Sequence, residues 1–249
     1  MILTVGLREF KSLFLSPLAW SILAVVQVIL GFLFLARLEA FQLYQPQLMA
    51  MDGAPGLTEI VLPDLLGNAA IILLLVVPLL TMRLVAEERR NRTLALLFSA
   101  PLSMTEIVLG KYLGILLFLL VLLLMIALMP LSLLAGASLD LGLMAAGFLG
   151  LALLLAGFAA VGLFMSTLTQ YTTVAAISTF GALLLFWILD WSGQGVGGGN
   201  WMADLSLFNH YKPFLEGIFD SGDAAYHVLL IATFLVLSIR RLDADRLGG

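Results

Sequence analysis

The sequence has no cysteine and only two histidines, His210 and His227, among its 249 residues. The lack of cysteine excludes a disulfide framework and a Cys-ligated metal site. The two histidines are too few and too far apart for the His pair of a helical zinc site. Charge is also scarce: 11% of the residues are charged and 62% are hydrophobic, whereas a soluble domain has about 25% charged residues. This composition indicates an integral membrane protein.

Several motifs of ATP-binding proteins and enzymes are missing as well. No phosphate-binding loop is present, because Gly110-Lys111 is followed by Tyr112 instead of Ser or Thr. A Gly-x-Ser-x-Gly elbow and a His-Glu-x-x-His motif are also absent. The middles of the apolar runs hold no Asp, Glu, Lys, Arg or His, which disfavours an ion-coupled transporter and an intramembrane protease. These absences favour a membrane subunit that takes its energy from another protein.

Six apolar runs are long enough to cross a bilayer, which takes about 20 residues. We therefore predict an all-α polytopic membrane protein with one domain over residues 1–249. The expected spans are about 17–37, 64–83, 111–135, 141–166, 172–191 and 224–241. The fourth span is rich in glycine, at Gly142, Gly147, Gly150, Gly157 and Gly162. Small residues permit close helix approach, so we expect this span inside the bundle or at a subunit contact.

Residues 1–16 are expected to form an amphipathic helix that lies on the membrane. Their apolar side chains recur every three or four positions, at Leu3, Leu7, Phe10 and Phe14. The alternative is a plain flank of the first span. The apolar run at 17–36 is longer than the core of a secretory signal and no Ala-x-Ala site follows it, so we expect no cleaved signal peptide.

The polar loop at residues 83–111 sets the expected orientation. It holds five basic and three acidic residues: Arg83, Arg89, Arg90, Arg92 and Lys111, with Glu87, Glu88 and Glu106. Arginine-rich loops between spans face the cytoplasm, and with six spans both termini are then cytoplasmic. Arg37 and Lys212 are the only two of the 12 basic residues that this orientation places outside.

The same loop has the pattern of a short projecting helix. Helix formers run from Glu87 to Phe98, a break follows at Pro101, and Ser103 with Glu106 forms a capping box for the next helix. A short helix of this kind suits docking into a partner's groove. A solvated loop that merely fixes topology is equally compatible with the spacing.

Two segments on the opposite side, 38–63 and 192–223, are longer than simple turns. The second contains a possible interfacial helix with apolar residues Leu205, Phe208, Leu215, Ile218 and Phe219. Aromatic residues of an outer belt would be Trp187, Trp191, Trp201 and Tyr211. One polar set on this side is the sole candidate for an interfacial lipid-modifying enzyme: Asp190, His210, Asp220, Asp223 and His227. Ordinary solvation at the interface also explains these residues.

The loop sequence AEERRNRTLALLFSAPLSMTEIVLGKYLG resembles that of ABC-2 type exporter permeases. The matching positions are Glu87, Glu88, Thr93, Leu94, Leu97, Pro101, Ile107, Gly110 and Lys111. Arg92 stands where the family usually has glycine, so we expect the turn before Thr93 to be helical instead of kinked. A second stretch, HYKPFLEGIFDSGDAAYHVLLIATFLVLS, resembles the gliding-motility type of this permease. Its matching external residues are His210, Phe214, Gly217, Asp220, Asp223 and Tyr226.

The resemblance implies a half-transporter that works with a dimer of cytoplasmic ABC ATPases. Residues 87–104 would be the coupling helix, and the N-terminal helix would touch the ATPase as well. The implied coupling residues are Glu87, Glu88, Arg89, Arg92, Thr93, Leu94, Leu97 and Pro101. This chain would bind no cofactor and catalyse no reaction, since ATP and Mg²⁺ belong to the ATPase.

The resemblance also implies a location and a second partner. The location is the bacterial inner membrane, and the second permease is expected to be a different chain with a large external domain. No nucleic acid is expected as a partner. The implied function is export of a substrate, or motion of the external partner, driven by ATP hydrolysis. The alternative is a membrane assembly or mechanotransmission subunit through which no cargo passes.

Overall fold

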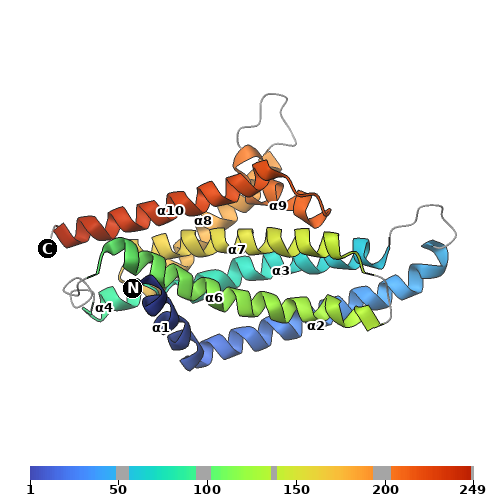
Figure 1. Cartoon of the computed structure of the whole chain (residues 1–249), viewed down its shortest axis with the longest axis horizontal. Helices are drawn as coiled ribbons and strands as arrows, with labels where there is room; N and C mark the ends of the chain where they lie inside the picture. The colour runs from blue at the N-terminus through green and yellow to red at the C-terminus, as the bar shows by residue number, and fades with distance from the viewer. Residues whose placement is uncertain (49–55, 94–101, 136–138, 193–202, 248–249) are drawn as a thin grey trace.

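The computed structural model describes residues 1–48, 56–93, 102–135, 139–192 and 203–247. Within these ranges the chain is helical and has no strand. In this described part of the chain, six helices are long and apolar enough to cross a membrane: Pro17–Pro46, Leu57–Arg90, Met104–Leu134, Leu141–Leu168, Thr172–Leu189 and Ser221–Arg246. They run lengthwise in an elongated bundle (Figure 1). The predicted fold class and the number of spans are confirmed.

The helices begin and end at residues with clear physical roles. In order they are α1 (Ile2–Leu15), α2 (Pro17–Leu48), α3 (Leu57–Thr81), α4 (Ala86–Arg90), α6 (Met104–Leu131), the 3₁₀ turn η1 (Ser132–Ala135), α7 (Leu141–Leu168), α8 (Thr172–Ser192), the 3₁₀ turn η2 (Ala203–Leu205), α9 (Leu207–Leu215) and α10 (Ser221–Leu247). The predicted capping box at α6 is present, with the Glu106 amide donating to the Ser103 hydroxyl at 3.2 Å. The Asp140 carboxylate accepts from two amides in the first turn of α7.

The first two spans are longer than their apolar runs. Helix α2 continues to Leu48, and α3 already begins at Leu57, so much of the expected external segment 38–63 is helical. The residues that end the first apolar run, such as Arg37 and Glu39, are good helix formers although they are polar. Arg37 forms an ion pair with Asp64 of α3. Hydropathy therefore marks the lipid-spanning part but not the helix end.

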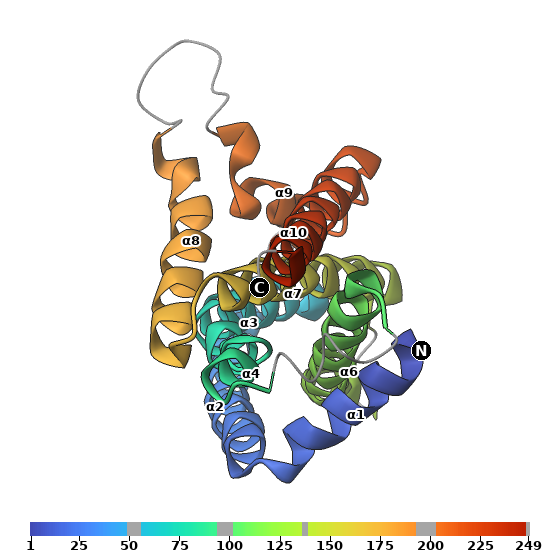
Figure 2. The same cartoon turned by 90° about the vertical axis from the view of Figure 1, so that its left-hand side faces the viewer.

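Helix α7 lies at the centre of the bundle (Figure 2). It contacts α3, α6, α8, α9 and α10. Its glycines allow this, because a Cβ atom on Gly150 would lie 2.4 Å from Cβ of Phe214 in α9, and one on Gly162 would lie 2.2 Å from the Thr81 hydroxyl in α3. The expected position of this span inside the bundle is confirmed.

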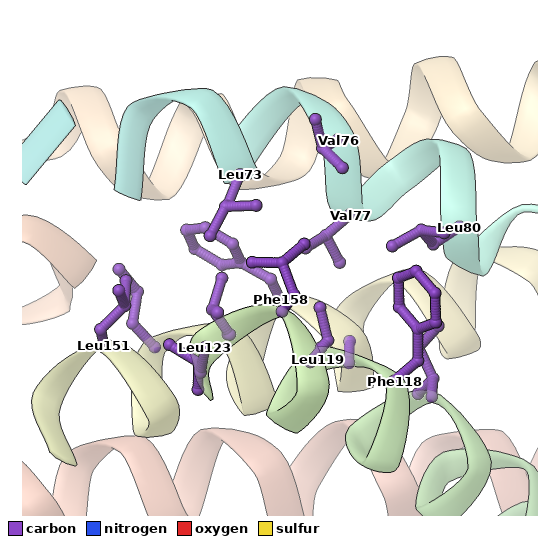
Figure 3. Packing of buried hydrophobic residues seen from close by; sticks show 14 of the residues in the cluster. Leu73, Val76, Val77, Leu80, Phe118, Leu119, Leu123, Leu151 and Phe158 are labelled. Carbon is purple, nitrogen blue, oxygen red and sulfur yellow. The ribbon is translucent and has the colours of Figure 1, made fainter. Parts of the chain in front are cut away.

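The core between α3, α6 and α7 consists of interdigitating apolar side chains (Figure 3). Those at its centre are Leu73, Val77 and Leu80 of α3, Phe118, Leu119 and Leu123 of α6, and Leu151 and Phe158 of α7. Lipid tails are as apolar as leucine, so within a membrane such helices are held by close packing, with little gain from removing apolar surface from water.

Helix α1 crosses the first turns of α6 (Figure 2). The backbones approach closely, since a Cβ atom on Gly110 would lie 2.6 Å from Cβ of Val5. Phe10 and Phe14 pack against the core, whereas Leu3 and Leu7 are 64% and 43% exposed. The N-terminal helix is confirmed, but its expected apolar stripe is divided between the bundle and the outer surface.

Candidate functional site around helix α4

Helix α4 follows a tight turn after α3 and lies at one end of the bundle (Figure 1). We call this the α4 end and the opposite one the distal end. The turn is held by Ser166 of α7, whose hydroxyl accepts from the amides of Val85 and Ala86, both at 3.0 Å. The same hydroxyl donates to the Met82 carbonyl at 3.1 Å. Ser166 is fully buried, and it satisfies two of the amides that a helix N-terminus leaves free.

Arg89 ties α4 to two more points of the bundle. Its guanidinium donates to the Thr167 carbonyl of α7 at 2.9 Å and forms an ion pair with Asp245 near the end of α10. Both charged side chains are mostly buried. Partial burial reduces the screening of this ion pair by water, whereas a fully exposed pair contributes only about 0–1 kcal/mol.

Lys111 of α6 is the third anchor. Its ammonium lies 2.8 Å from a carboxylate oxygen of Glu88 in α4 and 3.7 Å from one of Glu9 in α1. The Lys111 side chain is only 3% exposed. A buried ammonium is tolerated when it is paired and hydrogen-bonded, and here two carboxylates from different helices share it. We call Glu9, Glu88 and Lys111 the charge triad.

The end of α4 is a complete Schellman motif. The Thr93 amide donates to the Glu88 carbonyl at 3.0 Å, and the Arg92 amide donates to the Arg89 carbonyl at 3.3 Å. The motif needs a left-handed residue, and Arg92 has a φ of 57°. Glycine is usual at this position because it has no Cβ. The expectation of a helical turn before Thr93 is therefore wrong: Arg92 takes the kinked conformation that glycine would supply.

A cavity of about 400 Å³ lies beside the charge triad, between α1, α4 and the adjacent ends of α2, α3 and α6. Its walls carry both charge signs, with Arg8, Arg83 and Glu87 joining the three triad residues. The α4 end therefore carries a recess with charged walls.

The comparison with known families covers these same elements. The family model described as ABC-2 family transporter protein matches residues 5–245, from α1 to near the end of α10. The chain belongs to the ABC-2 transporter family. Its members are membrane components of transporters and are not themselves catalytic, and membership implies a partner ATPase. A search of curated proteins finds no match to the chain.

Five of the eight loop residues expected to couple this ABC-2 permease to an ATPase are described, and they fall into two groups. Glu88 and Arg89 point into the bundle and make the contacts described above. Glu87, Arg92 and Thr93 are exposed. The remaining three, Leu94, Leu97 and Pro101, lie outside the described residues.

Three anchors were not among the sequence candidates for this site: Glu9, Ser166 and Asp245. Lys111 was noted only as a loop cation and a family match. Its signal in the sequence is a single lysine at the start of a long apolar run, which suggests a buried and paired charge. Ser166 and Asp245 give no comparable signal.

The second expected motif lies at the distal end of the permease and forms the corner between α9 and α10. Asp223 and Tyr226 of α10 both contact His210 of α9. Phe214 is buried against Gly150 of α7. Gly217 follows α9 with a φ of 78°, and the Asp220 carboxylate accepts from the Gly222 amide at the start of α10. The motif residues therefore connect α9 to α10 and to α7.

Tyr211 differs from its expected place in an outer aromatic belt. It is fully buried, and its hydroxyl donates to the Leu66 carbonyl of α3 at 3.1 Å. Burial raises the pKa of the Tyr211 phenol.

Within the described part of the chain, no group of three or more His, Asp or Glu side chains is arranged to hold a metal. The polar set considered for a lipid-modifying enzyme instead makes the contacts of the α9–α10 corner, through His210 and Asp223. The side chains of Asp190, Trp191 and Trp201 lie outside the described residues.

Proposed function

We propose that this chain is the permease subunit of an ATP-driven exporter and that α4 transmits movements of a cytoplasmic ATPase to the bundle. The observation that carries the proposal is the anchoring of α4. Its residues and the preceding turn are held by side chains of α1, α6, α7 and α10. A helix of five residues fixed at so many points cannot shift without moving the helices that hold it.

The charge distribution supports a cytoplasmic position for the α4 end. Helix α1 and the last turns of α10 lie at this end together with α4 (Figure 1). The basic residues of these segments, of the turns on either side of α4 and of the start of α6 therefore fall on one side: Arg8, Lys11, Arg83, Arg89, Arg90, Arg92, Lys111, Arg240, Arg241 and Arg246. The positive-inside rule assigns such a side to the cytoplasm. Both termini would then be cytoplasmic, in a bacterial inner membrane.

The division of α4 into two faces suggests two roles. Glu87, Arg90 and Arg92 are exposed, and in our proposal they contact a dimer of ABC ATPases. Glu88 and Arg89 face inward, and they pass the movement to α6 and α10. ATP and Mg²⁺ would be bound by the ATPase, and α4 would move as a rigid lever while the bundle rocks between two states.

We further propose that the second permease is a different chain with a large external domain, as in the gliding-motility type of exporter. The support is the resemblance of the distal motif, including His210, Asp223 and Tyr226, to that type. A heterodimer would place two non-identical distal ends side by side. Copurification from native membranes tests this: one ATPase and two different permeases are expected, and recovery of this chain alone with an ATPase would refute the heterodimer.

Two neighbouring arginines allow a matched test of transmission through α4. Arg89→Gln removes the ion pair with Asp245, whereas Arg90→Gln changes an exposed residue next to it. In complexes of normal size and composition, Arg89→Gln should abolish the stimulation of ATP hydrolysis by the permease while the ATPase stays bound. Asp245→Asn should have the same effect, because it breaks the same pair.

For Arg90→Gln, the stimulation per bound ATPase should stay near wild type, and the amount of ATPase bound should fall. Full stimulation in the Arg89→Gln complex would refute transmission through this anchor. If stimulation persisted but no cargo-dependent hydrolysis were found for any component of the native membrane, the mechanotransmission alternative would be favoured.

A further inference from the structure

A cavity of about 270 Å³ lies between α2 and the first half of α3, toward the distal end of the bundle (Figure 1). Its polar residues are Arg37 of α2 with Asp64 and Asn68 of α3, which we call the α2–α3 polar group. The other residues that line it are apolar: Leu33, Phe34, Ala36, Ala40, Val61 and Leu65. Among the described residues of the cavity, Arg37 and Asp64 are the charged ones, so their charges cancel.

The ion pair between Arg37 and Asp64 leaves part of each side chain free. It joins Nε of Arg37 to one carboxylate oxygen of Asp64, and the two side chains are 46% and 44% exposed. The two Nη groups of Arg37 and the second oxygen of Asp64 can therefore bind another group. Asn68 lies one turn along α3 from Asp64, and its amide has no hydrogen-bond partner among the described residues. The polar group thus offers a cation, an anion and an amide to a molecule outside the chain.

The α2–α3 polar group lies at the depth of the lipid headgroups. Near the α4 end, the Arg83 guanidinium donates to the Ser16 hydroxyl at 3.3 Å, which marks one boundary of the membrane. Arg37 and Asp64 each lie about 20 residues along their helices from this contact, which is about 30 Å of helix. This length matches the hydrocarbon core of a bilayer. Asn68 lies about 6 Å deeper than Asp64, at the level where ester groups join a phospholipid headgroup to its chains.

From the polar group, an apolar stripe runs along each helix toward the middle of the membrane. On α2, Leu33 and Ile29 continue the face that carries the polar group, because each lies four residues from the one before it. On α3, Ile71 and Leu75 continue that face in the same way. Ile29, Ile71 and Leu75 are exposed on the surface of the bundle. A molecule whose polar end binds the polar group can therefore lay its apolar part along these two stripes.

We propose that the polar group and the two stripes form a binding site for a phospholipid with an ethanolamine headgroup. The lipid phosphate binds the Arg37 guanidinium, and the headgroup ammonium binds the Asp64 carboxylate. The Asn68 amide donates to an ester carbonyl, and the acyl chains follow the stripes of α2 and α3. With the orientation proposed above, this lipid belongs to the outer leaflet.

The charges of the site select this headgroup over two others. The anionic headgroup of phosphatidylglycerol brings a phosphate close to the Asp64 carboxylate and has no cation to offset the repulsion. The quaternary ammonium of phosphatidylcholine has no N–H to donate to that carboxylate. The ethanolamine ammonium has three N–H donors, as the lysine side chain does. A zwitterion with a primary ammonium therefore complements both members of the ion pair.

Photocrosslinking by lipids tests this site in the assembled complex. Three probes share the same acyl chains, one of which carries a diazirine, and differ only in an ethanolamine, choline or glycerol headgroup. Each probe is added at the same low fraction to phosphatidylcholine nanodiscs, and mass spectrometry identifies the crosslinked peptides. Exposed Ile177 and Leu185 of α8 provide a reference peptide on another part of the apolar surface.

We expect the ethanolamine probe to label the peptides of the two stripes about tenfold more than either other probe, the effect of one charge-assisted contact. All three probes should label the α8 peptide equally. The nanodiscs hold each probe in both leaflets, so the result does not depend on the orientation of the chain, and its failure would leave the proposed function in place.

Single variants separate a lipid site from an ion pair that only joins α2 to α3. Arg37→Gln should lower labelling by the ethanolamine probe to the level of the choline probe. Asp64→Asn should lower it as well, and should raise labelling by the glycerol probe, because Arg37 then faces the phosphate alone. Lys212→Gln is the matched control, since it removes the other basic residue of the distal side from an exposed position on α9 and should change nothing.

Equal labelling of the stripes by the three probes in the parent protein would overturn the proposal, whatever the variants do. Stronger labelling by the glycerol probe would overturn it in favour of an anionic lipid. Stripes that no probe labels would overturn it too, because another protein then covers them. An undiminished preference for ethanolamine in an assembled Arg37→Gln complex would also contradict the assigned contacts.

Discussion

Removal of the Lys111 charge should destabilise the permease strongly, because the ammonium is shared by two carboxylates in a poorly hydrated place. The Lys111→Met variant keeps much of the side-chain volume but leaves Glu9 and Glu88 unpaired. Breaking a buried ion pair by removing one partner destabilises proteins by about 3–5 kcal/mol. Here the carboxylates are 18% and 20% exposed, so they recover some hydration. We therefore expect the free energy of unfolding to fall by about 3 kcal/mol, near the low end of this range.

The geometry also predicts an order among the single variants. Glu88 lies within hydrogen-bond distance of the Lys111 ammonium at 2.8 Å, and a hydrogen bond to a charged group contributes about 1.5–3 kcal/mol. Glu9 is 3.7 Å away, where a partly hydrated ion pair contributes about 1 kcal/mol or less. The expected order of destabilisation is therefore Lys111→Met, then Glu88→Gln, then Glu9→Gln.

The assay is reversible unfolding of the purified permease by titration with a denaturing detergent, followed by circular dichroism. The double variant Lys111→Met/Glu88→Gln should be more stable than Lys111→Met alone, because it removes one of the two unpaired carboxylates. Glu87→Gln, an exposed neighbour, is the control and should change stability by less than about 0.5 kcal/mol. A loss below about 1 kcal/mol for Lys111→Met would show that the triad is hydrated and refute the reasoning.

Three further predictions concern packing and backbone. Gly150→Leu should prevent normal assembly, because the new Cβ atom would lie 2.4 Å from Cβ of Phe214. Gly181→Leu is the control and should assemble, because no atom lies within 4 Å of the position of its Cβ. Size-exclusion chromatography distinguishes assembled from misassembled protein. Arg92→Gly should leave stability unchanged or raise it by about 1 kcal/mol, because it removes a strained φ; a lowered melting temperature would contradict this. Ser166→Ala leaves two buried amides unpaired and should lower the free energy of unfolding by about 2–4 kcal/mol. A detergent unfolding curve identical to that of the parent protein would refute the capping role.

The general architecture could be predicted from the sequence because a bilayer imposes a simple condition. Each span must be about 20 apolar residues long, and six runs meet this condition. Glycines in the fourth run likewise predicted a central helix. The extensions of α2 and α3 were missed, since Arg37 and Asp64 end the apolar pattern but pair with each other in the helices.

The contacts of the candidate site could not be predicted in the same way. Arg89 and Asp245 are 156 positions apart, and a long-range pairing of this kind leaves no local pattern. Arg92 was expected to be helical, but the Schellman hydrogen bonds of α4 override the intrinsic preference of arginine. Local signals located the loop, and the packing of distant helices decided which of its residues face inward.

The most direct test of the central claim is a crosslinking measurement between α4 and the ATPase in native membranes. Single cysteines at Glu87 and Arg90, both exposed, carry a short photoactivatable crosslinker, and a cysteine at Ala225 of the distal end is the control. The account predicts crosslinks to an ABC ATPase from both α4 positions and none from Ala225. Crosslinks that are absent from α4, or equally strong from Ala225, would contradict the assignment of α4 as the element that receives the movement of the ATPase.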